Sequence, residues 1–384
     1  MRILFVLNST KIDGSVISAI NLMTGLTRLG VQCYVVQPDT AIDPIFIERT
    51  KGIVEHTYYA PLRPHVMKLA SESKGLTGKL KRLIKGTRTY WIFASWNEIK
   101  AIRHIISEIE PDIVHTNAGI FHAGYYASKS MNVPHVWHLR EYQDKDFHYE
   151  PAPSFSVFHQ ALMDSYVITI SNDILTYFQL QDSPKAQCIY NGCLSVKDAS
   201  YQGQKRDYFL CCSRISPEKG QESVIRAFAS FRTEHPSYKL VIAGTGEDGY
   251  VDHLKDVALQ AGCQEAVVFI GFQKDVKPLM REARALIVAS VYEGFGRMTA
   301  EACFCGCAVI GHNTGGTKEI LDITGGFPYD DDVELLQQMN TVADLDSPSY
   351  QKVVLEAQQK ALSTFSIEQN ISKTYALYKK VLDI

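Results

Sequence analysis

Largely apolar runs alternate along the chain with segments whose apolar residues recur at helical spacing. Residues 2–7 and 31–36 are short runs of this kind, which predict strands covered on both faces. Between them, apolar residues recur every three or four positions up to Gly30, a residue that favours the end of a helix. The order strand, loop, helix, strand is typical of a doubly wound α/β domain.

The second half of the chain repeats this plan. Further strands are predicted at residues 208–212, 239–243, 267–270, 286–289 and 308–310, with helices between them. With 384 residues, the chain is too long for one ordinary core. We therefore expect an α/β protein with one Rossmann-like domain over residues 1–193 and a second over 207–365. The polar segment between them, without apolar periodicity, is the expected linker.

The composition argues against several classes of protein. A net charge of −3 at pH 7 is not that of a general nucleic-acid binder. The nine cysteines include no Cys-x-x-Cys pair and no metal-like spacing with histidine. No apolar run of about 18 residues and no signal peptide are present, so we expect a cytoplasmic protein.

The stretch from Ser290 to Glu301 carries the strongest candidate chemistry. It reads Ser-Val-Tyr-Glu-Gly-Phe-Gly-Arg-Met-Thr-Ala-Glu and joins an apolar run to a helix expected from about Arg297. Glu293 then lies on the loop and Glu301 one turn into the helix. Between them, two glycines leave backbone amides accessible beside the partial positive charge of the helix start. This arrangement suits a diphosphate with a hydroxyl-bearing ring at each end.

Two other junctions between a predicted strand and a predicted helix add to this pattern. Residues 214–219 read Arg-Ile-Ser-Pro-Glu-Lys, and residues 315–319 read Gly-Gly-Thr-Lys-Glu. Arg214 offers a fork of donors to phosphate oxygens, and Lys219 adds a mobile point charge. A surface ion pair is the alternative interpretation, but the convergence of three such junctions favours a phosphate site.

As a set, these motifs resemble those of the retaining glycosyltransferases of family 4, whose two-domain fold is called GT-B. The resemblance is strongest over residues 207–319 and mostly architectural in the first half. It implies two Rossmann-like domains facing across a cleft, with the last helix, 366–384, crossing back to the N-terminal domain. The N-terminal domain would bind the acceptor, and the C-terminal domain would bind a nucleotide-sugar donor.

The resemblance also implies roles for individual residues. The implied catalytic residues are His138, Arg214, Lys219 and Glu293, with His138 lying against the donor sugar. The implied donor-binding residues are Gly14, Arg214, Lys219, Phe272, Glu293, Gly294, Phe295, Gly296, Met298, Thr299 and Glu301. Glu301 would accept hydrogen bonds from the ribose hydroxyls, and Glu293 from those of the transferred sugar.

The implied reaction needs neither a cofactor nor a metal ion. No Asp-x-Asp motif lies beside the three junctions, and Arg214, Lys219 and the helix starts already supply positive charge to a departing diphosphate. Retention of stereochemistry is compatible with front-face attack, in which the leaving phosphate takes the proton of the acceptor, and with a covalent intermediate. The sequence does not decide between the two.

A basic segment in the first half indicates a further surface. Residues 63–88 hold eight Lys or Arg residues and one acid, with leucines interleaved. Lys79, Lys81 and Arg82 could lie on anionic lipid or meet a phosphate-bearing acceptor, and a solvated face of an ordinary helix pair is the alternative. Arg140 and Glu141, which follow a predicted strand, are assigned to the same acceptor side.

The sequence therefore predicts a glycosyltransferase that moves a hexose-type sugar, most simply from a UDP-sugar, to a glycolipid or polysaccharide acceptor at the inner face of the cell membrane. A sugar-nucleotide epimerase or another GT-B enzyme is the alternative among enzymes. A non-catalytic sugar-nucleotide-binding partner is the alternative outside them. The sugar, base, acceptor, linkage and oligomeric state stay open.

Overall fold

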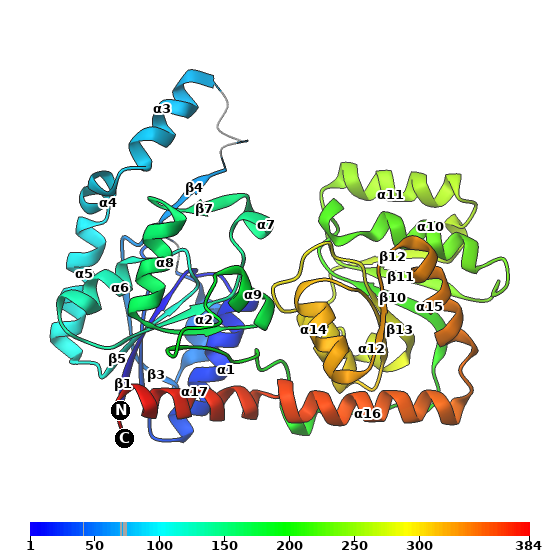
Figure 1. Ribbon diagram of the computed structural model, residues 1–384. Helices are drawn as coiled ribbons and strands as arrows, with labels where there is room; N and C mark the ends of the chain where they lie inside the picture. The colour runs from blue at the N-terminus through cyan, green and yellow to red at the C-terminus, as the bar shows by residue number, and fades with distance from the viewer. Residues whose placement is uncertain (41, 70, 72–74) are drawn as a thin grey trace. The chain divides into compact units, whose positions relative to one another are not determined.

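The computed structural model describes residues 1–40, 42–69, 71 and 75–384, which form two compact units. Unit 1 contains Met1–Gly192 and Ile367–Ile384, and unit 2 contains Cys193–Ser366. Each unit has its own parallel sheet, with helices on both faces (Figure 1).

The sheet of unit 1 has seven parallel strands. Their order across the sheet is β3 (Val54–Ala60), β2 (Gln32–Pro38), β1 (Arg2–Leu7), β5 (Ile113–Asn117), β6 (His135–Leu139), β8 (Tyr166–Thr169) and β9 (Ala186–Cys188). The order reverses between β1 and β5, which pair directly. The carboxyl ends of two such strands form the crevice where open α/β sheets bind ligands.

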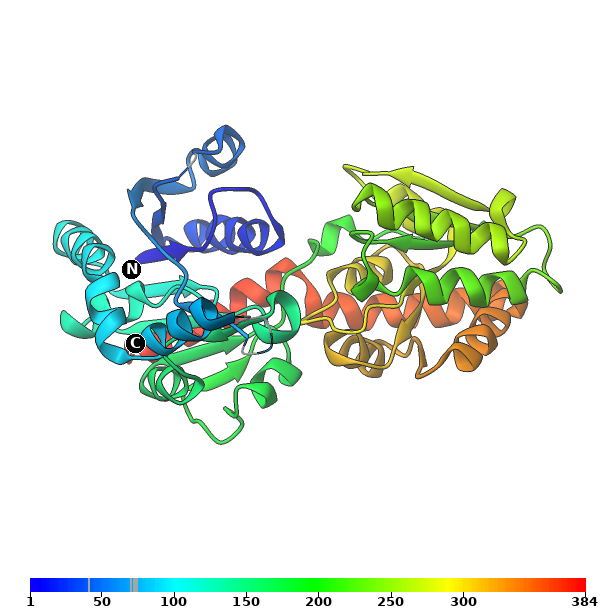
Figure 2. The same cartoon turned by 90° about the horizontal axis from the view of Figure 1, so that it is seen from above.

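Alternate side chains of β1 enter two different cores. Phe5 packs with α1 (Gly14–Arg28) and α17 (Ile367–Val381) on one face, and Val6 packs with α5 (Trp96–Ile109) and α6 (Ala123–Ser130) on the other. This alternation explains why β1 is apolar at every position from Ile3 to Leu7. Figure 2 shows the helices on both sides of this sheet.

Smaller elements extend unit 1 beyond its sheet. They are α2 (Pro44–Thr50), β4 (Val66–Lys68), α3 (Gly75–Lys85), α4 (Arg88–Ala94), α7 (Asp144–Phe147), β7 (Tyr149–Pro151), α8 (Phe155–Asp164) and α9 (Asn172–Tyr177). β4 and β7 pair as an antiparallel ribbon. Arg82 of α3 forms an ion pair with Glu150 of this ribbon and donates a hydrogen bond to the Lys68 carbonyl at 2.7 Å.

Unit 2 has six parallel strands around one core. Their order is β12 (Val267–Gly271), β11 (Lys239–Ala243), β10 (Arg206–Cys212), β13 (Ala283–Val288), β14 (Ala308–His312) and β15 (Phe327–Tyr329). The helices are α10 (Gln221–Phe231), α11 (Asp248–Gln260), α12 (Lys277–Glu282), α13 (Arg297–Phe304), α14 (Gly315–Thr324), α15 (Asp332–Asp344) and α16 (Ser347–Phe365). Here the strand order reverses between β10 and β13.

The α/β class and the return of the last helix to the first unit are both confirmed. The expected linker differs, because Cys193 donates a hydrogen bond to the Phe365 carbonyl at 3.0 Å and the segment after it belongs to unit 2. Strands β3, β4, β7 and β15 were not expected. His138 lies inside β6 rather than after it, His115 lies inside β5, and both are fully buried.

Candidate active site

Three loops meet at the carboxyl edge of the unit 2 sheet, at the switch point of the strand order. The loop after β10 pairs with the loop after β11 through Ile215 and Gly246. It also touches the loop after β13, because the Val291 amide donates a hydrogen bond to the Glu218 carbonyl at 2.9 Å. The short 3-10 helix Pro217–Lys219, which ends at Gly220, holds Lys219 between these contacts.

Lys219 and Glu293 form an ion pair at this edge. The Lys219 Nζ lies 2.6 Å from Glu293 Oε1, which also accepts a hydrogen bond from the Ser290 hydroxyl at 2.8 Å. Both charged side chains are about one-fifth exposed, at 21% and 22%. The pair is thus fixed in position and still open to solvent on one side. Ser290 was part of the predicted stretch but had no predicted role.

The Gly294–Gly296 turn packs closely against the start of α14. A Cβ atom on Gly316 would lie 2.3 Å from the Phe295 carbonyl oxygen, so only glycine fits there. The Gly316 amide donates a hydrogen bond to the Glu293 carbonyl at 2.8 Å. The starts of α13 and α14 are therefore held side by side, directly after Glu293.

This junction contains two buried hydroxyl groups without partners. Thr299 Oγ1 and Thr317 Oγ1 have no hydrogen-bond partner among the described residues, and both residues are at most 1% exposed. They converge on Gly296, where an added Cβ would lie 3.3 and 3.1 Å from them. Neither α13 nor α14 has a side-chain hydrogen bond at its N-cap. Unsatisfied hydroxyls and helix-start amides in one place fit an anion such as a phosphate.

Glu301 lies deeper in the same helix and has a partner that the sequence analysis missed. Arg297 Nη2 donates a hydrogen bond to Glu301 Oε1 at 2.9 Å. Burial raises the pKa of the Glu301 carboxyl, and Arg297 opposes that rise. The spacing of four residues on a helix could have revealed this pair.

The other predicted donor-binding residues are distributed around this edge. Arg214 is exposed and has no ion-pair partner in the part of the chain that the structure describes. Met298 lies in the first turn of α13 and is partly buried. Phe272 follows Gly271 at the end of the edge strand β12, with 73% of its surface exposed.

The carboxyl edge of unit 1 carries a different arrangement. Arg140, directly after β6, donates hydrogen bonds to Asn117 Oδ1 at 2.6 Å and to Asn191 Oδ1 at 2.7 Å. A third contact joins its Nη2 to His138 Nδ1 at 3.3 Å. Burial lowers the pKa of His138 well below its ordinary value, and Arg140 lowers it further, so the ring is neutral.

Glu141 and Gly14 are two further predicted residues of unit 1. Glu141 Oε1 accepts a hydrogen bond from the Gly119 amide at 3.0 Å, and Glu141 is 9% exposed. At the start of α1, the Asp13 carboxylate already accepts from the amides of Ser15 and Val16. These two helix-start amides are therefore occupied, and the role of Gly14 itself in donor binding stays a prediction.

The basic segment divides into two parts. Lys79 and Lys81 are exposed on α3, together with Leu80, Leu83 and Ile84, whose exposed fractions are 59%, 71% and 48%. Arg82 instead holds α3 against the β4–β7 ribbon through Glu150 and Lys68. Arg82 thus has a structural contact, and its expected role in lipid or acceptor binding stays a prediction.

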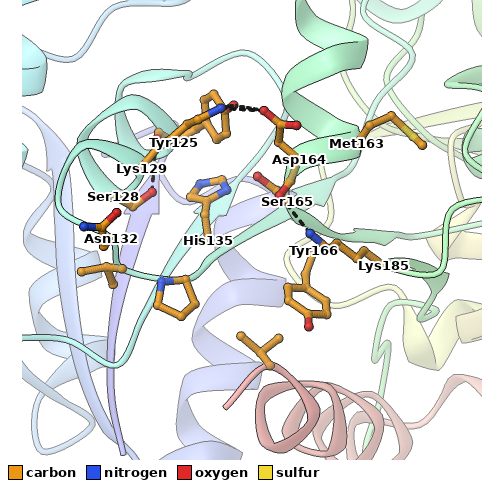
Figure 3. A pocket seen from close by; sticks show the side chains of 13 residues that line it. Tyr125, Ser128, Lys129, Asn132, His135, Met163, Asp164, Ser165, Tyr166 and Lys185 are labelled. Carbon is orange, nitrogen blue, oxygen red and sulfur yellow. Dashed lines mark hydrogen bonds and ion pairs between the residues drawn. The ribbon is translucent and has the colours of Figure 1, made fainter. Parts of the chain in front are cut away.

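A hollow of about 580 Å³ lies at the opposite, amino edge of the unit 1 sheet. It opens beside His135 and Tyr166, the first residues of β6 and β8. Figure 3 shows Tyr125 and Lys129 joined to Asp164 beside it, and Lys129 Nζ lies 2.6 Å from the Asp164 carboxylate. None of the predicted site residues lines this hollow.

The described residues contain neither a cluster of metal ligands nor a membrane-spanning helix. Among those residues, no three His, Cys, Asp or Glu side chains gather as a metal site would require. No helix within the same residues is long and apolar enough to cross a bilayer.

Parts of the sequence match known proteins. Residues 197–332 match the family model described as glycosyl transferases group 1. An uncharacterised glycosyltransferase of Methanocaldococcus jannaschii is 36% identical over 124 residues, which are 31% of each chain. An N-acetylgalactosamine-N,N'-diacetylbacillosaminyl-diphospho-undecaprenol 4-alpha-N-acetylgalactosaminyltransferase of Campylobacter jejuni is 28% identical over 182 residues, 45% of this chain and 48% of that protein. The matched segments thus span less than half of either relative.

Solved structures resemble the fold over nearly the whole chain. HepE of Anabaena in complex with UDP has a TM-score of 0.74 at 21% identity, covering 99% of this chain and 100% of that one. A glycosyltransferase of Rickettsia africae has a TM-score of 0.75 at 20% identity, with 99% and 98% covered. The chain therefore has the GT-B type of fold, and its residues 197–332 are similar to the glycosyl transferases group 1 family.

Proposed function

We propose that the protein is a retaining glycosyltransferase that transfers a sugar from a nucleotide-sugar donor to an acceptor hydroxyl. The observation that carries this proposal is the junction of α13 and α14. There, the Lys219–Glu293 pair stands next to two unpartnered hydroxyls and two helix starts without side-chain caps. The group 1 family match over residues 197–332 supports the same conclusion.

The diphosphate of the donor would occupy the space in front of Gly296. The amides of the first α13 turn, at Met298 and Thr299, and the hydroxyls of Thr299 and Thr317 would donate hydrogen bonds to its oxygens. Arg214 and Lys219 would balance the charge that grows on the leaving group as the glycosidic bond stretches. Because these donors are in place before binding, no reorganisation would be needed at the moment of reaction.

The two carboxylates would hold the two ends of the donor. Glu293, oriented by Lys219 and Ser290, would accept hydrogen bonds from the transferred sugar and stabilise positive charge developing on its ring. Glu301, oriented by Arg297, would accept the ribose hydroxyls. Solved structures of HepE with UDP and with UDP-glucose support a uridine donor for this fold, and Gly271 and Phe272 would lie near the base.

We propose that the reaction needs neither a metal ion nor a cofactor. Arg214, Lys219 and the helix starts provide the positive charge that a divalent cation supplies in other transferases. If these groups take the place of a metal ion, the leaving phosphate must contact Arg214 and Lys219 directly. Transfer that persists undiminished in excess EDTA supports the proposal, and transfer that depends on added Mg²⁺ or Mn²⁺ contradicts it.

The acceptor would be a glycolipid or polysaccharide reached at an anionic membrane surface. Helix α3 exposes Leu80, Leu83 and Ile84 at the spacing of one helix face, with Lys79 and Lys81 beside them. An exposed apolar face flanked by cations fits the headgroup region of a bilayer. The name of the Campylobacter jejuni relative, which includes a diphospho-undecaprenol substrate, supports a lipid-linked acceptor.

A thermal-shift panel of UDP-, GDP-, ADP- and TDP-sugars tests the donor site. The matching donor should raise the melting temperature of the wild-type protein, because a ligand that binds only the folded state stabilises it. The shift should disappear in Lys219→Ala and persist in Lys255→Ala, which breaks an exposed Lys255–Asp252 ion pair elsewhere in unit 2. A panel without any shift, or equal shifts in both variants, would contradict the proposed site.

A further inference from the structure

A chain of hydrogen bonds crosses the core of unit 1 and ends at His138. The Tyr378 hydroxyl of α17 lies 2.7 Å from His115 Nδ1, and His115 Nε2 lies 3.2 Å from His138 Nδ1. All three side chains are fully buried. Arg140 Nη2 reaches the same His138 Nδ1 at 3.3 Å. The contact of Tyr378 with His115 spans 263 residues of sequence.

Arg140 determines the direction of this chain. A guanidinium group only donates hydrogen bonds, so His138 Nδ1 must accept and the ring proton must be on Nε2. His115 Nε2 then donates to the same Nδ1, which leaves His115 Nδ1 to accept from the Tyr378 hydroxyl. Both imidazoles are neutral in this scheme, in agreement with burial lowering the pKa of each well below its ordinary value.

The last donor of the chain has no protein partner. His138 Nε2 is buried and makes no hydrogen bond to any described residue. Given the proton assignment above, it is an N–H group that lacks an acceptor, near the carboxyl end of β6 where ligands bind in such sheets. A lone-pair oxygen is the chemical group that satisfies it.

We propose that Arg140 is a positioning residue, which fixes the tautomer of His138 so that its Nε2–H donates to an oxygen of the bound glycosyl substrate. The proposal rests on the proposed function for the identity of that substrate. The proposal also excludes His138 as the general base, because an Nε2 that already carries a proton cannot accept another from the acceptor hydroxyl. The proton of the acceptor hydroxyl then has to leave through another group, such as the departing phosphate.

The opposite direction of the chain is available once Arg140 is removed. His138 Nδ1–H would donate to His115 Nε2, His115 Nδ1–H would donate to the Tyr378 oxygen, and His138 Nε2 would become an acceptor. Tyr378 permits both directions because a hydroxyl both donates and accepts. Arg140 permits only one.

Nitrogen-15 NMR of the histidine-labelled full chain reads the tautomers directly. In the wild-type protein, both His115 and His138 should carry their proton on Nε2. Arg140→Met should move both protons to Nδ1, whereas Tyr378→Phe and the exposed control Arg103→Met should leave them on Nε2. A wild-type His138 protonated on Nδ1 would overturn the proposal even if no variant folds. Unchanged tautomers in folded Arg140→Met would overturn it as well.

Kinetics separate a positioning role from a structural one. Transfer is followed as UDP release from UDP-glucose, or from the panel sugar that stabilises the protein most. Arg140→Met should lower kcat by about two- to tenfold with a smaller change in KM, the size of one lost hydrogen bond. Tyr378→Phe should lower the melting temperature and leave kcat within about twofold. Equal losses of kcat in Arg140→Met and Tyr378→Phe would overturn the proposal. An unchanged kcat in an Arg140→Met variant whose His138 proton has moved to Nδ1 would overturn it as well, because Nε2–H would then meet only a buried water.

The two proposals fail in different ways. The tautomers are read from the protein alone, so a donor panel without any response contradicts the proposed function and leaves the assignment of His138 Nε2–H standing. A reversed tautomer in a protein that transfers sugar contradicts only the role of Arg140.

Discussion

The two units place polar side chains at the same edge of similar parallel sheets, but the two edges differ in charge and burial. In unit 2, Lys219 and Glu293 keep about one-fifth of their surface exposed. In unit 1, His115 and His138 are fully buried, and burial keeps both neutral. A charged pair that is partly exposed suits the binding of an anion, whereas buried neutral imidazoles suit a hydrogen bond of fixed direction. Similar folds therefore support two kinds of chemistry.

The largest expected effect concerns the charged edge. Lys219→Ala and Glu293→Gln should each lower turnover at least about a hundredfold, because each removes a group that complements charge in the transition state. Steady-state kinetics with the matching donor measure this loss, and circular dichroism checks that the variants fold. Lys318→Ala, which breaks an exposed ion pair with Asp322 on α14, should retain turnover. Wild-type rates in both site variants would remove the basis for calling unit 2 the donor side.

A methyl group at the tightest point of unit 2 should have the next largest effect. Gly316→Ala places a Cβ 2.3 Å from the Phe295 carbonyl, so the α13–α14 junction must open. We expect the free energy of unfolding to fall by about 1–3 kcal/mol and donor affinity to fall with it. Gly249→Ala, in α11 with no atom within 4 Å of the new methyl, should be neutral or slightly stabilising. Urea unfolding measures the free energy of unfolding of both variants. Equal losses in Gly316→Ala and Gly249→Ala would contradict the prediction.

Helix α3 of unit 1 exposes Lys79 and Lys81 beside an apolar face. Replacing Lys79 and Lys81 by Glu should weaken binding to vesicles containing phosphatidylserine, by about 1 kcal/mol for each positive charge lost. Binding by the wild-type protein should also decrease as salt increases. Vesicle sedimentation measures both effects, and neutral phosphatidylcholine vesicles provide the control. If neither salt nor these substitutions change vesicle binding, the prediction is contradicted and α3 is an ordinary solvated helix.

The smallest expected effect concerns an acid in unit 1 that is buried without an ion pair among the described residues. Burial raises the pKa of Glu98 to about 7, although the Arg63 amide donates a hydrogen bond to it at 3.2 Å. Its pKa is higher in the folded than in the unfolded chain, so the unfolded state ionises first as the pH rises. Stability should therefore decrease between about pH 4.5 and 7 and change little above that range.

Glu98→Gln removes this penalty. The substitution should stabilise the protein on the order of 1 kcal/mol at pH 8 and have no effect at pH 4, where the carboxyl is protonated in both states. Melting curves at the two pH values measure the difference. Stabilisation of equal size at both would show that the titration of Glu98 is not its cause.

Local sequence patterns were sufficient to predict much of unit 2. The strand, loop and helix periods are short-range signals, and they identified the junctions that carry Arg214, Lys219, Glu293 and Glu301. Helix α13 begins at Arg297, as expected. The Arg297–Glu301 pair was missed although its spacing of four was visible, because Glu301 was considered only as a ligand contact. The capping of α1 by Asp13 was also missed, although an Asp directly before a helix is a common N-cap.

What the sequence by itself determined is the class of fold, the return of the last helix and the candidate residues at one edge of unit 2. Only the tertiary structure decided which of these residues pair with each other and which residues join them from a distance. Lys219 and Glu293 are 74 residues apart, Arg82 is held by Glu150, and His115 meets Tyr378 across 263 residues. Such contacts depend on how helices pack on a sheet, and a periodic pattern specifies which face is buried without specifying its partner. The proton on His138 Nε2 follows from those contacts and from no local pattern.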